Sequence, residues 1–95
     1  MSQHGEVRAR FRILGRVQGV GFRWWAAREA RALALAGTVQ NERDGSVEVE
    51  VEGPAMDLEQ FRELLEQGPP GATVDRVQEV EPTRGPLPTP FSIRA

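Results

Sequence analysis

The sequence predicts an α+β fold in which two helices cover one face of a mainly antiparallel sheet. Apolar and charged residues alternate over residues 7–14 and again over residues 46–52, which is typical of half-buried strands. Apolar residues recur instead at helical spacing over residues 22–35 and between Pro54 and Gly68. Taken in chain order, the segments predict the succession β-α-β-β-α-β, with a short fifth strand at the end.

The first strand and the first helix are expected to be joined by a glycine-rich segment. In the strand, over residues 7–14, the apolar side chains are Val7, Ala9, Phe11 and Ile13, and the alternating charged ones are Arg8, Arg10 and Arg12. The helix follows over residues 22–35, and Gly37 is expected to end it in the left-handed conformation that glycine adopts at helix ends.

Two further strands are expected at residues 38–42 and 46–52, joined by a tight turn at Asp44 and Gly45. Pro54 lies near the first turn of the second helix, where proline is favoured. Val74, Val77 and Val80 fit strict alternation poorly, so the fourth strand, over residues 74–80, is expected to contain a β-bulge. Residues 91–94 are expected to form the short fifth strand.

This order of elements predicts a ferredoxin-like βαββαβ sandwich, because parallel crossovers are right-handed and short connections form hairpins. The first and third strands are then antiparallel neighbours, so the three arginines should face Glu48, Glu50 and Glu52. We expect residues 1–95 to form a single domain, with residues 1–6 as a flexible tail. The fold hosts many functions, so the function has to be inferred from a site.

The composition excludes several kinds of chemistry. The chain has no cysteine and a single histidine, His4, so we expect no metal site and no cofactor. A net charge of −2 argues against general nucleic-acid binding. No apolar run approaches the roughly 20 residues of a membrane span, and no leader segment opens the chain, so we expect a cytoplasmic protein without a membrane partner. All 12 basic residues are arginines, whose planar, permanently charged groups suit oxyanions.

The glycine-rich segment, residues 15–23, is a candidate anion site. Three glycines before a helix allow backbone N–H groups and the positive end of the helix dipole to converge, although a plain flexible turn would look similar. Arg16 and Arg23 lie at this end of the helix, where a cation is unfavourable, which suggests that an anion normally lies between them. Either arginine pointing into solvent, or pairing with a distant carboxylate, is the alternative.

Asn41 ends the second strand just before the predicted turn, where asparagine is often only a turn residue. In the predicted fold, however, the first two strands run parallel. Their ends therefore lie at the same edge of the sheet, and Asn41 and the glycine-rich segment should share one cleft.

The stretches GRVQGVGFR (residues 15–23) and GTVQNERDGSVEVEVEG (residues 37–53) resemble the acylphosphatase family in sequence, order and spacing. The resemblance implies a small acyl phosphate as substrate and inorganic phosphate or sulfate as a competing anion. It also implies that Arg23 clamps the phosphate and that Asn41 holds the attacking water. The phosphate would be bound through the backbone N–H groups of Arg16, Val17, Gln18, Gly19, Val20 and Gly21. The family often has an aromatic residue where Thr38 stands and a final tyrosine where Ala95 stands, so substrate preference and stability are the properties these departures affect.

Other interpretations remain at this stage. A ferredoxin-like RNA-binding module would need aromatic residues on the exposed sheet face, and a non-catalytic anion-binding domain would not need Asn41. A third interpretation is a segment of a larger maturation enzyme. The start at Met1 and the lack of a linker argue against it. Trp24 and Trp25 either pack at the rim of the cleft or contact the acyl group. We expect a monomer.

Overall fold

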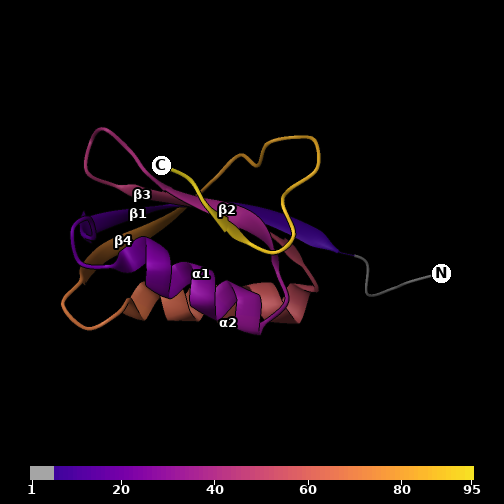
Figure 1. Cartoon of the computed structure of the whole chain (residues 1–95), viewed down its shortest axis with the longest axis horizontal. Helices are drawn as coiled ribbons and strands as arrows, with labels where there is room; N and C mark the ends of the chain where they lie inside the picture. The colour runs from indigo at the N-terminus through magenta and orange to yellow at the C-terminus, as the bar shows by residue number, and fades with distance from the viewer. Residues whose placement is uncertain (1–5) are drawn as a thin grey trace.

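The computed structural model describes residues 6–95 and has two layers, with both helices on one face of a single sheet (Figure 1). The elements are β1 (Val7–Arg16), α1 (Phe22–Ala32), β2 (Ala36–Asn41), β3 (Val47–Gly53), α2 (Ala55–Gln67), β4 (Thr73–Val80) and β5 (Ser92–Ile93). The strand order is β4-β1-β3-β2-β5; the β2–β5 pair is parallel, whereas β4–β1, β1–β3 and β3–β2 are antiparallel. The ferredoxin-like prediction is therefore confirmed. The tail predicted for residues 1–6 lies, apart from Glu6, outside the described residues.

The outer face of the sheet carries the predicted stripes of opposite charge. The register between β1 and β3 pairs Arg8 with Glu52, Arg10 with Glu50 and Arg12 with Glu48. Arg8 contacts Glu52 at 3.3 Å, whereas Arg10 reaches diagonally to Glu48 at 2.6 Å. Partly exposed pairs of this kind each contribute at most about 1 kcal/mol. The charged pairs require the same register as the valines, which are buried on the opposite face of β3. A slip of one residue would expose those valines.

Glu50 is the exception among the three glutamates, because it is buried and forms no ion pair with an arginine of the described residues. Its carboxylate accepts hydrogen bonds from the backbone N–H of Thr83 at 2.6 Å and from the Thr83 hydroxyl at 2.8 Å. These bonds fasten the proline-rich segment after β4 to the outer face of the sheet.

The core lies between the sheet and the helices. The buried residues of α1 are Phe22, Ala26, Ala27 and Ala30, and those of α2 are Leu58, Phe61 and Leu65. Phe61 packs edge-on against Phe91, with ring centroids 6.1 Å apart, so the C-terminal segment is anchored in the same core. Within residues 6–95 no helix is long and apolar enough to cross a membrane.

The predicted end of the first helix is wrong. The helix stops at Ala32, and the left-handed residue after it is Ala34, with φ of 58°. The N–H groups of Ala34 and Leu35 donate to the carbonyl oxygens of Arg31 and Ala30, both at 3.0 Å. This is a Schellman motif, which glycine usually closes but alanine closes here.

Gly37 instead lies inside β2, where it is required by a close approach of β3. A Cβ atom at this position would stand 2.0 Å from the backbone oxygen of Glu50 and 2.9 Å from the ring of Phe91. Gly37 is therefore required by the packing of β2 against β3 and Phe91, and not by the end of the helix.

The predicted bulge in β4 is confirmed. Leu14 pairs with Arg76 and Gly15 with Val74, so Asp75 is the extra residue. The bulge brings Val74 onto the same face as Val77, toward the helices.

We expect Gly37→Ala to destabilise the protein by roughly 2–5 kcal/mol, because the new methyl group meets backbone that cannot move aside. Gly45→Ala is the matched control. Gly45 also has a positive φ, of 95°, but a Cβ there meets nothing within 4 Å. Its cost should be only the roughly 1–2 kcal/mol of a left-handed alanine. Urea unfolding of both variants measures the difference, and equal losses would show that backbone strain alone makes Gly37 necessary.

Candidate active site

The segment between β1 and α1 leads directly into the helix N-terminus. Gly19 and Gly21 have φ of 75° and 79°, a left-handed conformation that glycine adopts without strain. Gly21 is the N-cap of α1, and no side chain among the described residues caps this end by a hydrogen bond. The first turn, residues 22–25, holds no acidic side chain. The first N–H groups of the helix and the positive end of its dipole are therefore available to an anion.

A pocket of about 190 Å³ lies in front of this helix end. Its lining residues come from the glycine-rich segment, the start of α1 and the end of β2: Val17, Gly19, Gly21, Phe22, Arg23, Trp24 and Asn41. Arg23 and Asn41, which are 18 positions apart in the sequence, thus border one space. We name it the phosphate pocket, after the ligand that the sequence predicts for these residues.

The sheet explains why Asn41 reaches the phosphate pocket. Val47 of β3 pairs with Ile13 of β1 on one side and with Asn41 of β2 on the other. Asn41, the last residue of β2, therefore lies level with Ile13, three residues before the end of β1. The chain that leaves β1 at this end of the sheet borders the same pocket as Asn41.

Of the other residues predicted to bind phosphate, Val17, Gly19 and Gly21 line the pocket, whereas Arg16, Gln18 and Val20 do not. Arg16 is the exposed last residue of β1 and pairs with Thr73, while Val17 is buried and Val20 packs against the core. Any contribution of Arg16, Gln18 and Val20 to anion binding would come from the backbone, and it stays a prediction.

Gln18 has a role that the sequence did not reveal. Its side-chain amide donates to the carbonyl oxygen of Glu42 at 2.7 Å and to that of Ser46 at 2.9 Å. The glycine-rich segment is thereby tied to the hairpin that begins at Asn41. The two acceptors belong to the backbone 24 and 28 residues further along the chain, so no local pattern predicts the bridge.

The hairpin itself is held by Asp44. Its carboxylate accepts hydrogen bonds from the hydroxyl of Ser46 at 2.6 Å and from the N–H of Ser46 at 3.0 Å, and it also contacts Arg12. These contacts, the Ser46 hydroxyl first among them, lower the pKa of Asp44 below its ordinary value. The turn between β2 and β3 is thus fixed by its own side chains, which limits the movement of Asn41.

Arg23 extends from the first turn of α1 toward the end of the chain. One of its terminal nitrogens donates to the carbonyl oxygen of Arg94 at 2.9 Å. A guanidinium group has five N–H donors, so this contact orients it and leaves other donors for a ligand. The arrangement combines a fixed cation, unpaired helix amides and a carboxamide around a small pocket, which suits a tetrahedral oxyanion.

Comparison with known proteins agrees with the resemblance seen in the sequence. The acylphosphatase family model matches residues 9–93. An acylphosphatase of Actinobacillus succinogenes is 45% identical over 87 residues, which cover 92% of this chain and 97% of that protein. The structure of acylphosphatase from Bacillus subtilis has a TM-score of 0.80 at 40% identity, over 93% of this chain and 98% of that one.

The same fold also occurs inside a longer protein. The structure of T. kodakarensis HypF matches with a TM-score of 0.80 at 34% identity, over 92% of this chain but only 12% of HypF. The match of the family model over most of the chain, together with the identity to full-length relatives, shows that the chain belongs to the acylphosphatase family of enzymes.

Proposed function

We propose that the protein hydrolyses acyl phosphates to a carboxylate and inorganic phosphate by in-line attack of water. The observation that carries the proposal is the phosphate pocket, where Arg23, the glycine-rich segment and Asn41 meet at an uncapped helix N-terminus. The names of the relatives support the same reaction.

In this mechanism the protein supplies positioning and charge. Arg23 and the backbone N–H groups of residues 16–21 neutralise the phosphoryl oxygens, whose charge is spread in the transition state. The carboxamide of Asn41 both donates and accepts hydrogen bonds, so it holds a water opposite the leaving oxygen.

The leaving group explains why so few residues are needed. A carboxylic acid has a pKa of about 4, so the carboxylate departs without a proton donor. A phosphate monoester expels an alkoxide, which calls for a general acid or a metal ion. The site therefore favours the anhydride over the ester.

Two other classes of function are less well supported. The outer sheet face, in the part of the chain that the structure describes, carries arginine–glutamate pairs where an RNA-binding module would carry stacking aromatic residues. A domain that only binds anions would have no use for a carboxamide at the pocket, and Asn41 lies there.

The proposal is tested by measuring phosphate release from benzoyl phosphate. An aryl phosphate monoester and an enzyme-free reaction are the controls. We expect rapid hydrolysis of the anhydride and none of the ester above the control. Equal rates on both substrates would contradict the role given to the leaving group.

Chelation should leave the turnover of benzoyl phosphate unchanged, because departure of a carboxylate needs no Lewis acid. Inorganic phosphate and sulfate should inhibit competitively, since each is a tetrahedral anion that fits the same donors. Initial rates with and without excess EDTA, and at several phosphate concentrations, check both statements. Activity that EDTA abolished and a divalent ion restored would overturn the mechanism.

A further inference from the structure

A second and larger pocket adjoins the phosphate pocket along the outer side of α1. Its volume is about 490 Å³. The lining consists of two tryptophans, two arginines, two prolines and one glycine: Trp24, Trp25, Arg28, Arg31, Pro69, Pro70 and Gly21. Gly21 and Trp24 line both pockets, so they form a common border. We call this space the tryptophan pocket.

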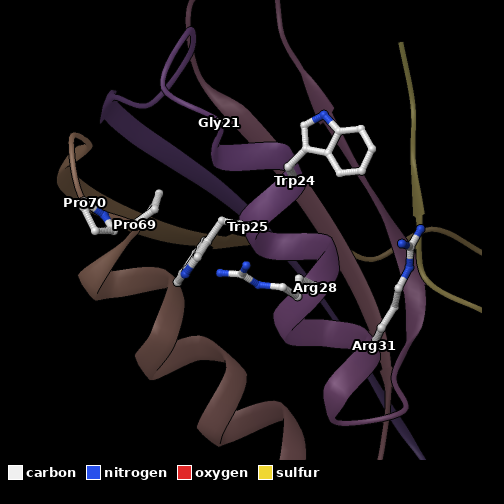
Figure 2. A pocket seen from close by; sticks show the side chains of 7 residues that line it. All are labelled: Gly21, Trp24, Trp25, Arg28, Arg31, Pro69 and Pro70. Carbon is white, nitrogen blue, oxygen red and sulfur yellow. The ribbon is translucent and has the colours of Figure 1, made fainter.

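Most residues that line the tryptophan pocket have apolar side chains, and one of these side chains, that of Trp25, is held in place. Trp24 is 73% exposed, so most of its large aromatic surface is available to a ligand. Trp25 packs edge-on against Phe22, with ring centroids 5.3 Å apart, and is thereby fixed. Figure 2 shows the two tryptophans projecting to different sides of α1, with the Pro69–Pro70 turn across from Trp25. Flat surfaces of this kind favour a flat, apolar ligand group.

Both charged residues that line the tryptophan pocket are arginines, and they differ in whether they have a partner. Arg31 donates to the carbonyl oxygen of Phe91 at 2.8 Å, and in Figure 2 it points away toward the C-terminal segment. Arg28 points into the space beside Trp25 and forms no ion pair with any residue between 6 and 95. No acidic side chain of the described residues lines the pocket. A cation with no partner beside an apolar wall favours a ligand that carries an anion of its own.

The spacing along α1 gives the length of this ligand. Arg28 lies six positions after Phe22, which lines the phosphate pocket, and this corresponds to roughly 9 Å along the helix axis at 1.5 Å per residue. An aromatic ring between the two anionic groups spans a distance of this order.

We infer that the tryptophan pocket is the subsite for the acyl group, and that it selects flat acyl groups carrying a second negative charge at their far end. The inference rests on the proposed function, because it places the phosphoryl group of the same substrate in the phosphate pocket. Trp24, which borders both pockets, contacts the ring, and Arg28, on the side of α1 where Trp25 lies, pairs with the distal anion.

Three substrates test the subsite: acetyl phosphate, benzoyl phosphate and 4-carboxybenzoyl phosphate. With the wild-type protein we expect kcat/KM to rise in that order. In Trp24→Ala the preference for benzoyl over acetyl phosphate should fall by about tenfold, the effect of losing one aromatic contact. In Arg28→Gln the preference for 4-carboxybenzoyl over benzoyl phosphate should fall by roughly 3–10-fold. In the wild type, that second preference should also weaken as salt is added.

The controls are Met56→Ala and Arg62→Gln on α2. Met56 is 83% exposed and Arg62 is a surface cation, and neither lines either pocket. Both variants should keep the wild-type preferences. Wild-type turnover of all three substrates, with preferences that neither Trp24→Ala nor Arg28→Gln changes, would overturn the subsite alone. A wild-type protein that hydrolysed none of the three would overturn the proposed function itself, and the subsite with it.

Discussion

Arg23→Ala should remove phosphate binding and lower turnover by roughly 10³-fold or more, the range seen when a cation that stabilises a phosphoryl transition state is lost. Arg23 is the only arginine lining the phosphate pocket among the residues that the structure describes. Arg23→Lys should restore little, because an ammonium group cannot reproduce the two parallel hydrogen bonds of a guanidinium. The measurements are kcat, KM and the inhibition constant of inorganic phosphate.

Arg23→Ala should fold almost normally. Removing a cation from the positive end of α1 is favourable, and losing the hydrogen bond to the Arg94 carbonyl is unfavourable, so the free energy of unfolding should change by less than about 1 kcal/mol. Arg62→Ala, which removes a surface arginine of α2 that lines neither the phosphate pocket nor the tryptophan pocket, is the control for net charge and should keep full activity. An Arg23→Ala protein with wild-type kcat would move the active site elsewhere.

The sheet was predictable because apolar and charged residues alternate along β1 and β3. Valines on the inner face of β3 and glutamates on the outer face exclude a slip of one residue against β1, and the structure pairs the arginine and glutamate stripes as expected. The bulge in β4 was predictable for the same reason, since Val74 and Val77 reach the same face only if one residue is extra.

The end of α1 was not predictable from local signals. Gly37 follows an apolar helical pattern and looks like a cap, but its lack of a side chain serves the contact with Glu50 of β3. Ala34 takes the left-handed position although alanine has no preference for it. Tertiary packing explains Gly37, and such a contact between distant residues cannot be read from the local sequence.

The functional site, too, was only partly predictable from the sequence. Arg23 and Asn41 were identifiable because motif and topology both point to them, and the phosphate pocket brings them together. Their catalytic roles stay predictions. The contacts that hold them were not visible, because Gln18 and Arg23 bind carbonyl oxygens, which every residue has.

Asn41→Ala should lower kcat by about 10²–10³-fold while the inhibition constant of inorganic phosphate changes little. The reason is that the proposed role of Asn41 is to hold water, whereas Arg23 and the backbone amides hold the phosphate. Asn41→Asp should also be slow, because it keeps the shape of the side chain but places a negative charge near the incoming phosphoryl group. Gln40→Ala is the control: it removes the neighbouring carboxamide, which hydrogen-bonds to Glu42 and does not line the phosphate pocket.

The separation of kcat from phosphate affinity distinguishes the possible roles of Asn41. A loss in kcat alone would mean that Asn41 stabilises the transition state and does not contribute to phosphate affinity. This is the result expected of a group that holds the attacking water. Loss of phosphate affinity with normal turnover at saturation would make it a ligand-binding residue. If neither constant changed, Asn41 would be a turn residue of the β2–β3 hairpin. Since Gln18 and Asp44 already fasten that hairpin without it, its place at the pocket would then need another explanation.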